Sequence, residues 1–325
     1  MRTAVGILVL SALVPLAGCS PSESATSSAS GSSSSPPAPA LTTKTATTVY
    51  KSFDKAYAAA LTKADAGSYD RTGLAKVLSS PQLEAAEFTS RYLRLVHESR
   101  RASTKPSRVK LTYAAPAAAG ADAVVIGTER SGQIEGSLQV LRRAAPDRPW
   151  TLAMNVDTAL GSLPMPAEAK AAVPSTQDRA LARTIVRRAM AYVDGGSSSG
   201  LIPGAAVADV RDLDTDLAVQ KVTKKTTFWG PAMKDVTAAG GPVVVFRTTS
   251  GLLILAAAET AVTVSNISGE AISYQSPFDR LFEDSGRHAS MTNHYALVMA
   301  ITAKDGAKPI VAGASLSTVM PPKLR

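Results

Sequence analysis

The order of periodic segments limits what this chain can fold into, because helical patterns precede strand-like runs and this order occurs twice. Residues 46–64 carry an apolar side chain every four positions, which predicts one buried helix face made of Val49, Phe53, Tyr57 and Leu61. A second helix is predicted after Ser80-Pro81, where Ser can cap a helix and Pro suits its first turn. Its expected buried face is Ala85, Phe88, Tyr92 and Leu95. Strands are then expected at 109–113, 123–127, 134–141 and 150–156.

The second half repeats this order. A helix is expected at 176–193, where Ser175 and Asp178 have the pattern of a capping box. Its expected buried face is Leu181, Ile185, Ala189 and Tyr192, and strands are expected at 243–248, 252–264, 295–303 and 309–316. Helices followed by a mostly antiparallel sheet define an α+β fold. We therefore expect two consecutive α+β modules, at 45–160 and 161–325, related by a diverged duplication.

Cys19 is the only cysteine, and it ends the sequence Leu16-Ala17-Gly18-Cys19. A basic start and an apolar stretch precede it, which is typical of a secretory signal peptide and too short to span a bilayer. Leu-Ala-Gly-Cys has the form of a bacterial lipobox. We expect removal of residues 1–18 and attachment of a diacylglycerol to the Cys19 thiol; an ordinary signal peptide with a chance cysteine is the alternative. A lone cysteine also excludes disulfides and thiolate metal sites.

Residues 19–44 are rich in serine and proline, which predicts a flexible tether with little to bury. About 25 such residues would span roughly 25–30 Å. Lys and Arg outnumber Asp and Glu by 35 to 26 in the chain, so anionic membranes or wall polymers would attract it. Export argues against nucleic acid as a partner. The expected location is the outer face of the cytoplasmic membrane.

Several segments resemble a family of uncharacterised actinobacterial lipoproteins of the Streptomyces type. The resemblance lies in the lipobox with its Ser-rich tether and in five further segments: Ser80-Pro81-Gln82-Leu83, Arg91-Tyr92-Leu93-Arg94-Leu95, Arg148-Pro149-Trp150-Thr151-Leu152, Gly241–Arg247 with Ser250-Gly251, and Pro309–Gly313. It implies tandem modules similar to nuclear-transport-factor-2-like and cystatin-like folds, each with N-terminal helices packed on a curved, mostly antiparallel sheet. It implies no activity, because none of these segments is a catalytic motif.

One basic run is a candidate contact for anionic polymers or headgroups, with Glu98 as its one acid. It contains Arg91, Arg94, Arg100, Arg101, Lys105, Arg108 and Lys110. The alternative is the solvated face of a helix and its exit loop, which is the more common origin of such runs.

Catalytic patterns are incomplete. Ser52 and Lys55 fit the Ser-x-x-Lys motif of penicillin-binding enzymes, but its companion motifs are missing, so a helix surface is the better interpretation. Asp212-Leu213-Asp214-Thr215-Asp216 starts like a calcium loop but lacks the required Gly and Glu. His288 and His294 lie near Asp279, Glu283 and Asp284 in sequence, which could form an acid–base or metal site.

These observations favour a non-enzymatic binding or interaction protein of the cell envelope, held at the membrane by the lipid on Cys19. The expected partners are the membrane and an anionic wall polymer or envelope protein. No cofactor, metal site or catalytic residue is assigned. The alternative is a secreted-side hydrolase or ligand-processing enzyme around His288, His294 and Asp284.

Overall fold

The structure is a computed structural model that describes residues 43–66, 71–98, 107–118, 121–130, 136–143, 147–167, 173–213, 220–230, 241–271 and 287–324. The expected signal peptide, Cys19 and nearly all of the tether lie outside these residues. Within them, no helix is both long and apolar enough to cross a membrane.

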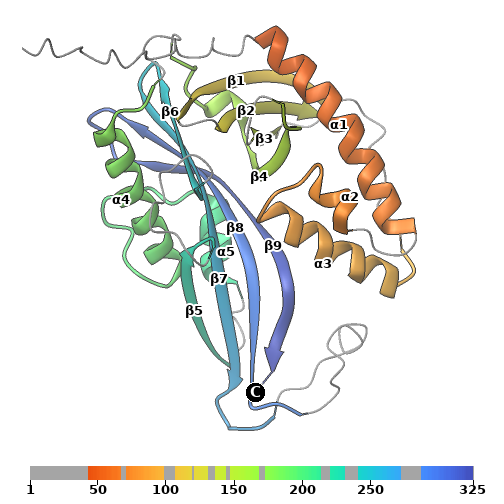
Figure 1. Cartoon of the computed structure of the whole chain (residues 1–325). Coiled ribbons are helices and arrows are strands. Elements are labelled where there is room, and N and C mark those ends of the chain that lie inside the picture. The colour runs from red at the N-terminus through yellow and green to blue at the C-terminus, as the bar shows by residue number, and fades with distance from the viewer. Residues whose placement is uncertain are drawn as a thin grey trace, which may run out of the picture. The chain divides into compact units, whose positions relative to one another are not determined.

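The first half consists of three helices followed by a four-stranded sheet (Figure 1). The elements are α1 (Thr43–Ala66), α2 (Arg71–Ala75), α3 (Gln82–Leu95), β1 (Ser107–Ala118), β2 (Ala121–Arg130), β3 (Gly136–Arg143) and β4 (Thr151–Thr158). The strands pair antiparallel in the order β1-β2-β3-β4. Helices and sheet share an apolar core that includes Phe53, Leu74, Ile126 and Leu152. Val49, Tyr57 and Leu61 pack against this core, which confirms the helical stripe predicted for α1.

The second half consists of two helices and a five-stranded antiparallel sheet. The elements are α4 (Thr176–Val193), α5 (Ala205–Asp212), β5 (Gln220–Phe228), β6 (Val243–Thr248), β7 (Gly251–Asn266), β8 (Ser290–Lys304) and β9 (Ile310–Leu324). The order is β5-β7-β8-β9, and β6 pairs with β7 beyond the end of β5. The α+β class is therefore confirmed, with antiparallel pairing throughout both sheets.

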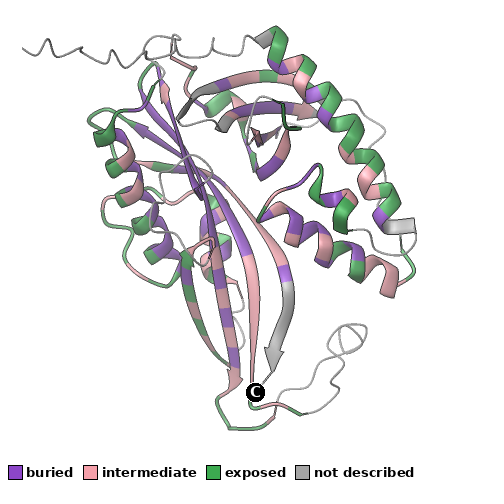
Figure 2. Cartoon of the chain, in the orientation of Figure 1, coloured by how far each residue is buried: buried purple, intermediate pink, exposed green. Residues whose placement is uncertain are grey.

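Strand β7 is buried on both faces along its first eight residues, 251–258. This part of the strand is coloured purple in Figure 2. Ile254 packs in a cluster with α4 and α5, whereas Leu253 packs in a cluster with the first sheet. Alternate residues of a strand point to opposite faces, so covering both faces produces an unbroken apolar run.

The two sheets share an apolar cluster in which Val125 and Met154 of the first sheet pack with Phe246 and Leu253 of the second. The backbones approach closely at Gly313, where an added Cβ would collide with the Asp157 carbonyl oxygen and lie 2.9 Å from Thr158 Cβ. The Thr158 hydroxyl also donates a hydrogen bond to the Ala312 carbonyl over 2.9 Å. The first half therefore packs against the second.

The shortest elements were not predicted. Helices α2 and α5 contain 5 and 8 residues, which is too short for a repeating apolar stripe. Strand β5 contains Lys221, Lys224 and Lys225 and carries no apolar run. It lies at the edge of its sheet, where lysines are common because they discourage pairing with other chains.

Two side-chain predictions are wrong. Ser80 does not cap α3: Pro81 is the N-cap residue, and no side chain bonds there. The Ser80 hydroxyl instead accepts a hydrogen bond from the Trp229 indole N–H over 2.8 Å. Leu181 is 51% exposed, although Ile185, Ala189 and Tyr192 on the same helix are buried.

Candidate functional site

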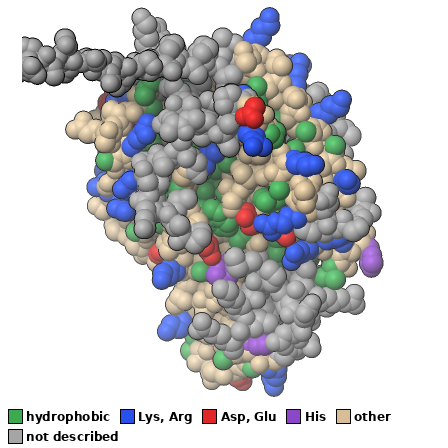
Figure 3. All heavy atoms as spheres, viewed as in Figure 1, with side chains coloured by type: hydrophobic (Ala, Val, Ile, Leu, Met, Phe, Trp, Pro, Cys, Tyr) green, Lys and Arg blue, Asp and Glu red, His purple; other side chains and the backbone are tan. Residues whose placement is uncertain are grey.

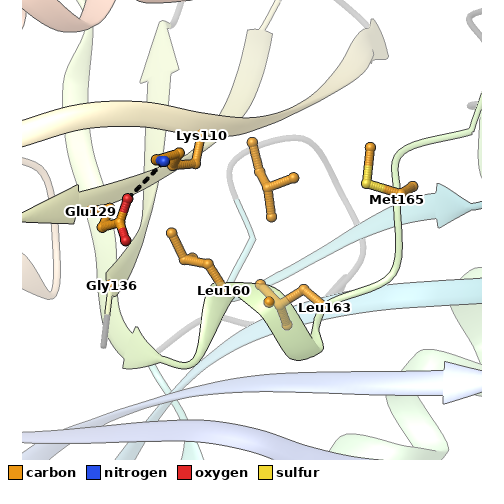
Figure 4. Close-up of a pocket in the computed structure, with 8 residues that line it drawn as sticks. Lys110, Glu129, Gly136, Leu160, Leu163 and Met165 are labelled. Carbon is orange, nitrogen blue, oxygen red and sulfur yellow. Dashed lines mark ion pairs between the residues drawn. The ribbon is translucent and has the colours of Figure 1, made fainter. Parts of the chain in front are cut away.

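A pocket of about 320 Å³ opens beside the first sheet, where β1, β2 and β3 meet the segment that follows β4. Leu111, Leu160, Leu163 and Met165 provide its apolar lining (Figure 4). At its edge, the Lys110 ammonium and the Glu129 carboxylate form an ion pair, with 2.9 Å between Lys110 Nζ and Glu129 Oε2. The pocket can therefore hold an apolar group while a polar group meets the charged pair.

Glycines shape this pocket. A Cβ on Gly136 would lie 2.5 Å from Leu160 Cδ1, so the missing side chain leaves space for Leu160 beside the sheet. A Cβ on Gly127 would lie 3.2 Å from Leu160 Cδ2. Gly161 also lines the pocket, but a Cβ there would meet nothing within 4 Å. A Cβ at position 161 would therefore lie in open space at the edge of the pocket.

A second polar arrangement lies on the second sheet. His294 Nδ1 of β8 is 2.7 Å from Glu259 Oε1 of the adjacent strand β7. The histidine side chain is 11% exposed and the glutamate side chain 33% exposed. A carboxylate on one ring nitrogen orients an imidazole for acid–base chemistry at the other. Among the described residues, however, the buried His294 Nε2 contacts no hydroxyl or other hydrogen-bond partner that could act as a nucleophile.

The sequence pattern indicated His294 but not its partner. The carboxylates expected near it, Asp279, Glu283 and Asp284, lie outside the described residues. Glu259 comes instead from the neighbouring strand, and its signal was a single charged residue within an otherwise apolar run. His288 lies just before β8 and is half-buried, whereas His97 is exposed beyond the end of α3.

The basic run at 91–110 is largely occupied by internal contacts where it is described. Arg91 and Arg71 both bond to the Glu87 carboxylate, at 3.0 and 2.7 Å. Arg94 Nε donates to the Ser90 carbonyl over 3.3 Å, and Lys110 pairs with Glu129. Arg108 is exposed, and the remaining candidates lie outside the described residues: Arg100, Arg101 and Lys105.

The two other motif candidates are surface features. Ser52 and Lys55 are exposed on α1 beside buried Phe53, as the helix-surface interpretation predicted. Asp212 is exposed at the end of α5, and Asp214 and Asp216 lie outside the described residues. Within the described part of the chain, no group of three or more His, Cys, Asp or Glu side chains is arranged to hold a metal ion.

The strongest polar cluster is structural and joins α4 to β6. The Asp178 N–H donates to the Ser175 hydroxyl and the Ser175 N–H donates to Asp178 Oδ2, which completes the predicted capping box. Arg247 donates from Nε and Nη2 to the two Asp178 oxygens, at 2.9 and 2.8 Å. Burial would raise the pKa of Asp178, but the hydrogen bonds from Ser175 and Arg247 outweigh burial and lower this pKa below its ordinary value.

Two further buried polar side chains fix the shared core. The Tyr113 hydroxyl donates to the Pro164 carbonyl over 2.5 Å, and burial raises the pKa of Tyr113 to about 12. Arg142 of β3 donates to the Gly241 carbonyl over 2.5 Å, and burial lowers the pKa of Arg142 to about 10. The first bond joins the first sheet to the segment after β4, and the second joins this sheet to the residues just before β6.

Comparison with known protein families, curated proteins and solved structures finds no match to this chain.

Proposed function

We propose that this chain is a lipoprotein on the outer face of a bacterial cytoplasmic membrane, and that it binds a small ligand without transforming it. The lipobox ending at Cys19 supports the anchor, and the pocket beside the first sheet supports the binding role. In this proposal the membrane is its first partner, reached through the lipid on Cys19. An anionic wall polymer or another envelope protein is the second.

The pocket is the observation on which the binding role depends. Its volume of about 320 Å³ falls at the lower end of the range for small-molecule sites, and its lining is mostly apolar. We propose as ligand a small amphipathic molecule, with its apolar part against Leu160 and Leu163 and its polar group at Lys110 and Glu129.

We also propose that the chain is a pair of related modules, 45–160 and 161–325, each with N-terminal helices on a curved sheet. The order of helices before strands in both halves supports this arrangement. So does the resemblance to the tandem-module lipoproteins of Streptomyces-type bacteria.

The anchor is tested by replacing its attachment atom. We expect Cys19→Ala to release the protein into the medium or to stall its processing, because two acyl chains are what holds it stably at the membrane. Mass spectrometry of the mature wild-type protein should find a diacylated N-terminal cysteine. A mature N-terminus at another residue, or normal processing and membrane retention of Cys19→Ala, would disprove the anchor.

The pocket is tested with the fluorescent probe 8-anilinonaphthalene-1-sulfonate, which combines an apolar body with one charge. We expect saturable binding to the wild type and to Gly161→Ala. Gly161→Leu should weaken binding by about tenfold or more, because its side chain occupies the space of the probe. Circular dichroism of the three proteins controls for folding. Equal probe affinity in all three would mean that this pocket is not the binding site.

A hydrolase or ligand-processing enzyme is the second candidate, and the Glu259–His294 pair is the observation that favours it. Hydrolysis of a panel of activated esters and amides by the wild type, compared with His294→Gln, tests this role. Turnover that is lost in His294→Gln would favour the enzyme over the binding protein. Equal rates in both, or rates equal to buffer, would exclude His294 as a catalytic base for these substrates.

A further inference from the structure

We propose that the exposed side of helix α4 is a docking surface for a bilayer that contains anionic phospholipid. The proposal rests on the lipid anchor proposed above, which would hold the helix near such a bilayer. The surface, called here the α4 arginine face, consists of the exposed residues Leu181, Arg187 and Arg188 and the half-buried Arg179 beside them.

The helix aligns these side chains in two rows. Arg179 and Arg187 are eight residues apart, so they follow one flank of α4. Leu181 and Arg188 are seven apart and follow the opposite flank. The exposed side chains between the rows are small along most of the helix, namely Ala180, Thr184 and Ala191, with Gln177 in the first turn. Both rows can therefore meet one flat surface, and Figure 3 shows Lys and Arg side chains gathered over α4.

No carboxylate on α4 neutralises these arginines. The only acid in the helix is Asp178, which is buried and bonded to Ser175 and Arg247. Among the described residues, no ion pair includes Arg179, Arg187 or Arg188. In α3, by contrast, Arg91 shares the Glu87 carboxylate with Arg71. The positive charge of these three arginines of α4 is thus available to an external anion.

A bilayer fits this surface better than a soluble polymer does, because the face also carries an apolar side chain. Leu181 is 51% exposed among the arginines, and a headgroup region offers phosphates to the arginines and acyl chains to the leucine. The proposed tether of roughly 25–30 Å would keep the bilayer within reach, which raises its effective concentration.

The experiment uses the mature lipidated protein in vesicles of phosphatidylcholine, with and without phosphatidylglycerol. Cys19 is the only cysteine and its thiol would carry the lipid, so Thr184→Cys provides one reactive thiol on the α4 arginine face. Ser52→Cys on the exposed side of α1 is the matched control site. Energy transfer from a fluorophore at either site to a headgroup-labelled lipid reports the distance to the bilayer.

We expect phosphatidylglycerol to bring the α4 label to the bilayer at low salt, and high salt to reverse this, while the α1 label changes little. In the labelled protein, the double change R187Q and R188Q should lower the ratio of docked to undocked protein by about 30-fold, at about 1 kcal/mol per basic residue. The pair K51Q and K55Q removes the same charge from α1 and should leave the ratio unchanged.

Equal transfer with and without phosphatidylglycerol would overturn the docking surface. Equal losses of docking from the R187Q and R188Q pair and from the K51Q and K55Q pair would also overturn it. A soluble polymer would be the better ligand if poly(glycerol phosphate) released the α4 label from the bilayer while Leu181→Gln left docking intact. Failure of the protein to remain on phosphatidylcholine vesicles would contradict the anchor instead. In that case, co-sedimentation with phosphatidylglycerol vesicles, compared between wild type and the R187Q and R188Q protein, still decides whether the face binds.

Discussion

Helices α3 and α4 end in the same way. In both, the second residue past the C-cap returns a hydrogen bond to the last turn: Glu98 N–H to the Leu93 carbonyl and Gly196 N–H to the Ala191 carbonyl, each over 2.8 Å. This pattern is the Schellman motif, which places one residue in the left-handed region. In α4 that residue is Gly195, with φ of 94°, whereas in α3 it is His97, with φ of 56°.

Their beginnings differ. Helix α4 satisfies its first turn locally through Ser175 and Asp178, and Arg247 then ties the same carboxylate to β6. Helix α3 has no side-chain cap, and Ser80 contacts Trp229 in the second half instead. A Ser before a helix can therefore serve either the helix or a distant partner, and only the tertiary contact separates the two cases.

The largest difference should appear within α4, between its buried and exposed sides. We expect Ile185→Ala to lower the free energy of unfolding by about 2–5 kcal/mol, because the side chain is 1% exposed and leaves a cavity. Leu181→Ala, at 51% exposure, should change it by about 0.5 kcal/mol or less. Urea unfolding measures both. A comparable loss for Leu181→Ala would mean that another element covers this side of α4.

The next largest difference in stability should lie between variants at the starts of α3 and α4. We expect Asp178→Asn to lower the free energy of unfolding by about 1–3 kcal/mol, because the charge that accepts hydrogen bonds from Ser175 and Arg247 is lost. Ser80→Ala removes one hydrogen bond to Trp229, not a cap, and should cost about 1 kcal/mol or less. If Ser80→Ala lowered helix content and stability as much as Asp178→Asn, the contrast between the two starts would be wrong.

The start of α4 should also depend on pH in a way that the start of α3 does not. The folded pKa of Asp178 is lowered, so its carboxylate binds fewer protons in the folded than in the unfolded state. Its contribution is complete above the unfolded pKa of about 3.9 and is lost as the pH falls through the folded pKa. Unfolding of wild type and Asp178→Asn across the acid range should show the stability difference shrinking. A difference that stays constant there would assign it to packing, not to charge.

Much of the fold could be predicted from the sequence, because α1 carries an apolar stripe, α4 carries a capping box and β6–β9 carry apolar runs. Helix α4 begins and ends at the predicted residues, 176 and 193. Where the apolar pattern is short or interrupted by polar residues, prediction failed. Helices α2 and α5 are too short to show a stripe, and β5 alternates lysine and threonine at a sheet edge.

The candidate sites were harder to predict, because they join residues that are distant in sequence. Lys110 of β1 and Glu129 of β2 line the same pocket as Met165. Nothing in the local sequence pattern indicates that the missing side chain of Gly136 leaves space for Leu160. The partner of His294 is 35 residues away on the next strand. The number of basic residues also made the run at 91–110 a candidate contact, although a solvated face was the more common explanation. Its pairing with Glu87 and Glu129 is visible only in three dimensions.

The shared Schellman motif allows the two helix ends to be exchanged. We expect His97→Gly to raise the free energy of unfolding by about 0.5–1 kcal/mol, because a glycine adopts the left-handed region without the clash of a Cβ. Gly195→His should lower it by about 1 kcal/mol, and by strain alone, since a Cβ at Gly195 would meet nothing within 4 Å. The double variant should then lie near the wild type, because the two sites are on separate helices and share no partner. Chemical denaturation of the three proteins measures these changes. A loss of stability in His97→Gly would show that the imidazole itself stabilises the end of α3, and the two helix ends would then be alike only in their backbones.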